Sequence, residues 1–155
     1  MSIFDFLYDK TKKSERLIVD NYKQLRVNEF WNNVLKYEEC LKKKGVYPNG
    51  VLGILIDNRI EFFTILLAAN KIGAIVVPIY VKTGFDKLKQ MIQDYDIQFI
   101  VTNIKFEGIN NITTSIIDET VYLCVLVQPN QKNVNWMMLH LLCKLLVQRV
   151  FPKEY

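Results

Sequence analysis

Glycine is scarce in this chain and is missing from its C-terminal part. The sequence holds 6 glycines in 155 residues, and none of them follows Gly108. Loops that grip a nucleoside triphosphate need glycines, because only glycine lets the backbone approach the phosphates closely and present successive amides to them. A glycine-rich phosphate loop is therefore excluded within residues 109–155.

Cysteine and histidine are also few. The 3 cysteines, Cys40, Cys124 and Cys143, are far apart and odd in number, which argues against a disulfide framework and against the spacing of a zinc site. The single histidine is His140. No carboxylate or nucleophile is fixed beside it by sequence, so a helix-surface role is favoured over that of a general base. We therefore expect no metal site and a reducing, cytoplasmic location.

Long apolar runs and a strong charge of one sign are lacking as well. No stretch is long and apolar enough to span a bilayer, and the acidic Asp5 and Asp9 interrupt the N-terminal segment where a signal peptide would need an apolar run. The net charge of +4 comes from 20 basic and 16 acidic residues, with lysine clusters within residues 10–13 and 42–44. Lysines in the last turn of a helix complement its negative end. We therefore expect no nucleic-acid-binding surface and no transmembrane segment.

A strand, a helix and a second strand follow one another in the middle of the sequence. The first branched apolar run, 51–56, is short and typical of a strand that is buried on both faces in a parallel sheet. The second run, 74–77, ends at Pro78, which lacks an amide hydrogen for the sheet. Between them apolar residues recur at helical spacing, with Asn58 able to cap the start and Gly73 able to end the helix. This pattern predicts a right-handed βαβ unit.

Further elements are predicted on both sides of this unit. They are a short helix at 3–8, a hairpin of 17–19 with 22–25, a helix over 27–44 that Gly45 ends, a helix that begins after Thr83, and strands at 97–102 and 113–117. For the helix after Thr83 we expect a capping box with Asp86. The residues predicted to face the core from the helices outside the βαβ unit are Ile3, Phe4, Phe6 and Leu7 in the first, Val27, Phe30, Trp31, Val34, Leu35 and Leu41 in the second, and Phe85, Leu88, Met91, Ile92 and Tyr95 in the third.

Several residues in the βαβ unit resemble those of a known family. They are Asn58, Glu61-Phe62, Ala68-Ala69, Gly73-Ala74 and Pro78-Ile79. In order and spacing they are similar to the N-terminal region of the AMP-forming adenylating enzymes, which include acyl-CoA synthetases, aryl-CoA ligases, luciferases and the adenylation domains of peptide synthetases. The resemblance covers residues 3–118 in outline and rests on scaffold residues. One departure is Val51, which stands where the family usually has an acidic residue.

We expect an α/β fold of βαβ units, with a mainly parallel sheet flanked by helices, a small N-terminal hairpin and a helical C-terminal tail. The resemblance implies the N-terminal fragment of an ATP-dependent, AMP-forming acyl-CoA ligase or adenylation enzyme. Such an enzyme activates a carboxylic acid as its acyl-adenylate and passes it to CoA or a carrier thiol, using ATP and magnesium. The family's phosphate loop and catalytic residues lie beyond the matched region. We therefore assign no catalytic, cofactor-binding or metal-binding residue, and we expect the fragment to be inactive by itself and to hold none of these cofactors.

The character of the sequence changes after residue 118. We divide the chain into 1–118, similar to the N-terminal subdomain of the family, and 119–155, a divergent tail with an amphipathic helix at 135–150. The apolar face of that helix could cap the sheet, meet a second copy of the chain or lie on a membrane surface, in that order of preference. A frameshift would explain both the missing phosphate loop and the divergent tail.

Three carboxylates elsewhere in the sequence could in principle take part in chemistry. Glu61 lies near the start of the central helix, where a negative charge is stabilising, and Asp94 and Asp96 flank a turn where solvated carboxylates are the usual finding. None of these three is predicted to be a site. An alternative function is a non-catalytic interaction or regulatory module, which would associate with itself or with a full-length relative through the C-terminal apolar helix.

Overall fold

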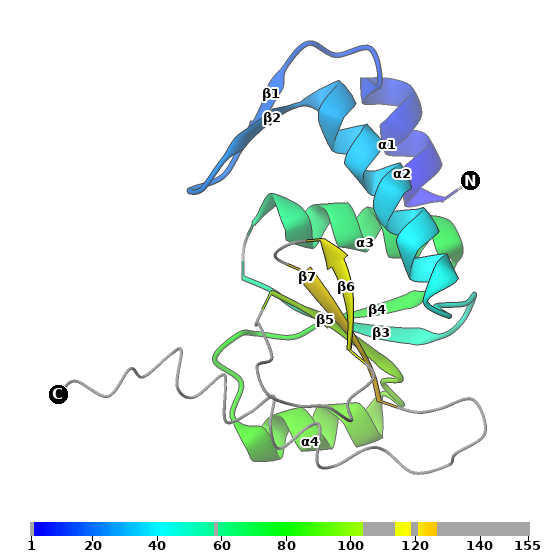
Figure 1. The fold of residues 1–155 in the computed structure, drawn as a ribbon, viewed down its shortest axis with the longest axis vertical. Coiled ribbons are helices and arrows are strands. Elements are labelled where there is room, and N and C mark those ends of the chain that lie inside the picture. The colour runs from blue at the N-terminus through cyan, green and yellow to red at the C-terminus, as the bar shows by residue number, and fades with distance from the viewer. Residues whose placement is uncertain (1, 58, 104–113, 119–120, 127–155) are drawn as a thin grey trace, which may run out of the picture. The chain divides into compact units, whose positions relative to one another are not determined.

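The computed structural model describes residues 2–57, 59–103, 114–118 and 121–126. The chain divides into two compact units, of which the first comprises residues 1–50 and 56–76 and the second residues 51–55 and 77–155 (Figure 1). The helix predicted at 135–150 lies outside the described residues. No helix in the described ranges combines the length and the apolar character that crossing a bilayer requires.

The first unit contains three helices and a hairpin. The helices are α1 (Ile3–Thr11), α2 (Val27–Lys43) and α3 (Ile60–Ile72), and the hairpin pairs β1 (Leu17–Val19) with β2 (Gln24–Arg26) in antiparallel register. Gly45 and Gly73 have φ values of 95° and 86° just beyond α2 and α3. This left-handed conformation suits glycine, so both predicted helix ends are confirmed.

Aromatic packing joins α1 to α2, and the Phe4 amide joins α1 to α3 by donating a hydrogen bond of 3.1 Å to Asn70 Oδ1. The rings of Phe4 and Tyr8 each meet the Trp31 ring edge to face, with centroids 5.5 and 5.4 Å away. The Trp31 indole nitrogen donates a hydrogen bond of 2.9 Å to the Thr11 hydroxyl. Ile3 and Phe6, which were predicted to dock, are exposed. That part of the prediction is wrong, because the short helix presents only one narrow face to α2 and α3.

A five-stranded sheet has the order β4-β3-β5-β7-β6. Strands β3 and β5 pair in parallel, whereas β7 pairs antiparallel with both β5 and β6. The α/β class is therefore confirmed, and β3 and β4, the two strands of the predicted βαβ unit, are neighbours in the sheet. The antiparallel β7 was not predicted, and it follows the boundary placed at residue 118. The strands are β3 (Val51–Leu55), β4 (Ile75–Pro78), β5 (Phe99–Thr102), β6 (Thr114–Asp118) and β7 (Val121–Val125).

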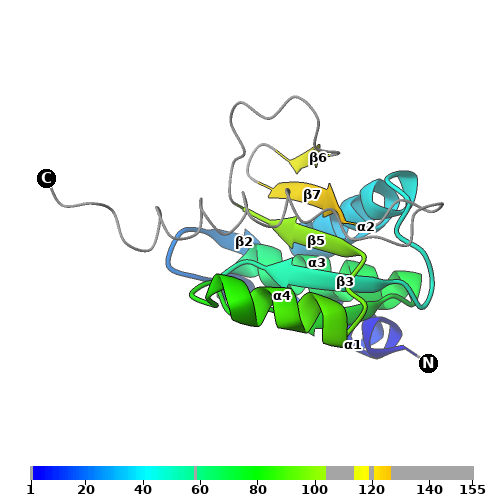
Figure 2. The same ribbon diagram turned by 90° about the horizontal axis from the view of Figure 1, so that it is seen from below.

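The core of the second unit lies between the sheet and α4 (Phe85–Asp94), which runs along the sheet in Figure 2. Leu88 and Ile92 of α4 pack with Leu55 and Ile100 of the strands in one buried cluster. Cys124 of β7 belongs to the same cluster, and burial raises the pKa of its thiol to about 12. Cys124 therefore acts as a small apolar side chain.

Three details of the helices differ from the sequence analysis. Helix α4 begins at Phe85 with Gly84 at its N-cap and no side-chain cap, so the capping box of Thr83 and Asp86 is wrong. Tyr95 is exposed because the helix ends at Asp94 and the chain leaves the helical path. Leu35 is exposed as well, since it lies at the border of the buried face of α2.

Candidate functional site

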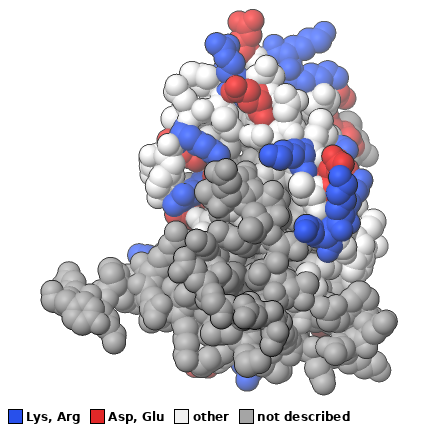
Figure 3. All heavy atoms as spheres, in the orientation of Figure 1, with Lys and Arg blue, Asp and Glu red and all other residues white. Residues whose placement is uncertain are grey.

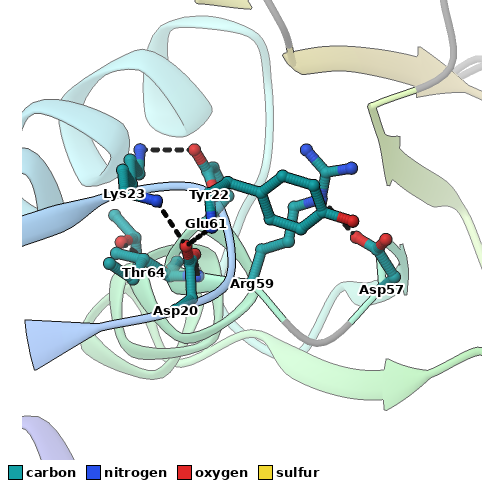
Figure 4. Close-up of polar contacts among 8 residues, drawn as sticks. Asp20, Tyr22, Lys23, Asp57, Arg59, Glu61 and Thr64 are labelled. Atoms are coloured by element: carbon teal, nitrogen blue, oxygen red, sulfur yellow. Dashed lines mark hydrogen bonds and ion pairs between the residues drawn. The ribbon is translucent and has the colours of Figure 1, made fainter.

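A polar cluster of the first unit lies where the β1–β2 turn meets the start of α3 (Figure 4). Asp20, Tyr22 and Lys23 come from the turn, and Arg59 and Glu61 come from the first residues around the α3 N-terminus. We call these five residues the hairpin clamp. Titratable groups gathered from two segments are the usual starting point for a search for catalytic chemistry.

Asp20 is the centre of the hairpin clamp. One carboxylate oxygen, Oδ1, accepts hydrogen bonds from the amides of Tyr22 and Lys23 at 2.7 and 2.8 Å, which closes the turn. The other, Oδ2, accepts from the amide of Ile60 at 2.8 Å and so caps α3. The hydrogen bond from the Ile60 amide is the largest cause of the lowered pKa of Asp20.

This cap differs from the one that the sequence indicated. Asn58, the predicted cap, lies outside the described residues, and the N-cap residue is Arg59, which makes no side-chain cap bond. Asp20 is 40 residues away from Ile60 along the chain. The sequence carries no local signal for such a contact, although the Asp20-Asn21 pair did mark the turn.

The other members of the hairpin clamp pair with one another. Lys23 and Glu61 form an ion pair, and the Arg59 guanidinium lies 3.7 Å from the centroid of the Tyr22 ring. Arg59 also donates to Asp57 Oδ1 at 2.6 Å. Glu61 is therefore a partner of the hairpin, which the sequence analysis missed. These contacts join the hairpin to α3. The carboxylates of Asp20 and Glu61 bind protein groups, which indicates a structural role.

A second ion-pair network joins α2 to α3. Glu38 accepts hydrogen bonds from Lys42 at 2.5 Å and from Lys71 at 2.6 Å. Burial acts to raise the pKa of Glu38, but the two lysines outweigh it and the pKa is lowered. Glu38 is thus a charged carboxylate that holds two helices together, and no reacting group lies beside it among the described residues.

The remaining candidate residues do not converge on one point. Asp94 and Asp96 are exposed, and Asp96 has a left-handed φ of 51° at the turn before β5. His140 and Cys143 lie outside the described residues. Within the described ranges, no group of three or more His, Cys, Asp or Glu residues could hold a metal ion. Basic and acidic side chains lie interspersed over the described part of the face in Figure 3.

Replacing Asp20 by alanine is expected to lower the midpoint of thermal unfolding by roughly 2–6 °C. The change removes the cap of α3 and the closure of the turn together. Circular dichroism of the purified chain measures it. As a control, Asp9→Asn breaks one exposed ion pair with Lys12 and should shift the midpoint by about 1 °C or less. Equal midpoints for the two variants would contradict the role of Asp20.

The same carboxylate predicts a dependence on pH. The pKa of Asp20 in the folded chain lies below its usual value of 3.8, so the charged form is the one that stabilises the fold. Its contribution is complete above the usual value and is lost as the pH falls through the folded pKa. The difference in midpoint between the unchanged chain and Asp20→Asn should therefore shrink below about pH 4.

Comparisons with known proteins identify the fold. A model of the family described as AMP-binding enzyme matches residues 8–139. Gramicidin S synthase 2 of Brevibacillus brevis is 25% identical over 88 residues, which cover 57% of this chain and 2% of that protein. Its counterpart from Aneurinibacillus migulanus gives the same values. The chain thus spans a small part of the curated relatives that it matches.

Several solved structures share the fold of this chain. The NpsA N-terminal subdomain of Klebsiella oxytoca superposes with a TM-score of 0.60 at 14% identity, over 68% of this chain and 28% of that one. VinN gives a TM-score of 0.61 at 20% identity, over 64% and 27%. The family match runs past residue 118 and includes β7. Because the family model matches residues 8–139, which are most of this chain, the chain belongs to the AMP-binding enzyme family.

Proposed function

We propose that this chain forms the N-terminal part of an ATP-dependent, AMP-forming acyl-CoA ligase or adenylation enzyme. The observation that carries the proposal is the family match over residues 8–139. One of the structures with the same fold is the NpsA N-terminal subdomain in complex with 3-hydroxyanthranilyl-AMSN. The complete reaction would join a carboxylic acid to the AMP moiety of ATP with release of pyrophosphate. A thiol would then displace AMP to form a thioester.

The contribution of these residues to such an enzyme is scaffolding. The described part supplies a βαβ unit, the hairpin clamp and the core around α4, and the carboxylates of the clamp are engaged in structural contacts. The sequence offers no glycine after Gly108 for a phosphate loop. We therefore propose that the 155 residues alone neither hold ATP, magnesium or CoA nor catalyse adenylation.

Partner and location form a further part of the proposal. A second copy of the chain or a full-length relative is the proposed partner, and the apolar face predicted for residues 135–150 supports it. The proposed location is the cytoplasm. Sedimentation equilibrium of the purified chain tests the self-association, because a single species of monomer mass at high micromolar concentration would exclude a homodimer.

Calorimetric titration tests the proposed lack of nucleotide binding. The full, cooperatively folded chain is titrated with magnesium ATP and, separately, with a stable acyl-adenylate mimic. We expect no saturable heat with either ligand. Saturable binding in the micromolar range would overturn the scaffold assignment and would place a phosphate site within these 155 residues. A pyrophosphate-release assay with a panel of carboxylic acids should likewise give no signal above the protein-free control.

A further inference from the structure

An open groove lies in the first unit, between the end of α1, the start of the hairpin and the first turns of α2. Its volume is about 620 Å³, within the range of small-molecule sites in proteins. Val27, Phe30 and Trp31 of α2 form its floor together with Leu67 of α3, and all four are buried. The base of the groove is therefore apolar.

The rim of the groove carries positive charge. Lys10 and Arg16 line it, and both side chains are exposed. Neither forms an ion pair in the part of the chain that the structure describes, and no carboxylate is among the lining residues. Glu15, next to Arg16 in sequence, is not a lining residue. An apolar floor thus lies below two cations that have no ion-pair partner among the described residues.

The two rim hydroxyls are already engaged within the protein. Thr11 Oγ1 accepts from the Trp31 indole nitrogen at 2.9 Å and donates to the Leu7 carbonyl at 2.7 Å. Ser14 Oγ accepts from the Arg16 amide at 3.3 Å. These contacts hold the walls in place, and Lys10 and Arg16 are the charged groups of the rim with capacity for a ligand.

We propose that this groove binds an amphipathic anion, with a carboxylate head at Lys10 and Arg16 and an aliphatic tail of about ten carbons on the apolar floor. A guanidinium matches the two oxygens of a carboxylate, and an ammonium adds a point charge. The tail removes from water the apolar surface of the exposed Leu17 and of the half-buried Leu7 and Ile18, which also line the groove. A cationic amphiphile with the same tail meets repulsion at the rim, and a short acid has too little apolar surface to bind well.

Three ligands test both halves of the proposal on the full chain by calorimetry. Decanoate has the complete pattern, decyltrimethylammonium keeps the tail and reverses the charge, and butyrate keeps the head and shortens the tail. We expect saturable decanoate binding below about 1 mM, with the other two ligands at least about tenfold weaker. Equal binding of decanoate and decyltrimethylammonium would mean unspecific adsorption and would overturn the proposal, as would the absence of saturable decanoate binding.

Substitutions of the rim residues Lys10 and Arg16 test whether decanoate binds in the groove. Arg16→Gln and Lys10→Gln should each weaken decanoate binding by about three- to tenfold. Lys36→Gln, which removes an exposed cation of α2 outside the groove, should leave the affinity unchanged. Since Lys10, Arg16 and Lys36 are exposed, all three variants should keep the unfolding midpoint of the original chain. If the Lys36 variant loses as much affinity as the rim variants, a general charge effect replaces the groove as the explanation.

Discussion

Replacing Leu123 by alanine is expected to lower the free energy of unfolding by about 2–5 kcal/mol. Leu123 is fully buried in β7 and lies opposite Val101 of β5 in the sheet. Its truncation removes apolar contacts and leaves a cavity that the neighbouring strands can fill only in part. Urea unfolding followed by circular dichroism measures the change.

The control for Leu123 is the same substitution at an exposed position. Leu35→Ala on α2 should lower the free energy of unfolding by at most about 0.5 kcal/mol. Leu35 is exposed, so its truncation leaves no buried cavity. Similar losses for the two variants would show that β7 is not part of the core.

A chain ended after residue 118 is expected to lose cooperative unfolding, since β6 pairs with β7 and β5 would lose β7 as its neighbour.

Replacing Gly53 by alanine is expected to cost about 1–3 kcal/mol. A Cβ atom at Gly53 in β3 would lie 2.8 Å from Ile79 Cδ1 and 3.3 Å from Ile97 Cγ2. Both isoleucines are buried, so either side chain can shift only by displacing packed neighbours. The entropy that alanine removes from the unfolded chain returns only about 0.4–1 kcal/mol. Urea unfolding again measures the net effect.

A double substitution isolates the steric cause. Ile79→Val deletes the Cδ1 atom that the new methyl group would meet, and by itself it should cost about 0.5–1.5 kcal/mol. The loss in Gly53→Ala with Ile79→Val should be smaller than the sum of the two single losses, because the second change relieves the clash of the first. Strict additivity would show that the close approach between residues 53 and 79 does not limit the packing.

Local patterns in the sequence predicted most of the elements. The helical spacing of apolar residues located α2 and α3, the short branched runs located β3, β4 and β5, and Asp20-Asn21 marked the turn of the hairpin. The two helix ends at Gly45 and Gly73 followed from the left-handed conformation that glycine adopts easily. These features depend on residues within a few positions of one another, so each is visible in a short window of sequence.

Local sequence patterns did not predict the contacts between segments that are far apart in the chain. Asp20 accepts a hydrogen bond from the Ile60 amide at the start of α3, 40 residues away along the chain, and Glu61 pairs with Lys23 of the hairpin. Likewise β7 pairs between β5 and β6, although its residues were placed in a divergent tail. The sequence alone thus determined the family and the order of most elements, because both depend on residue types and their spacing within short stretches of the chain. Only the tertiary structure decided which charges meet and which strand lies inside the sheet, since those choices depend on packing between residues far apart in the chain.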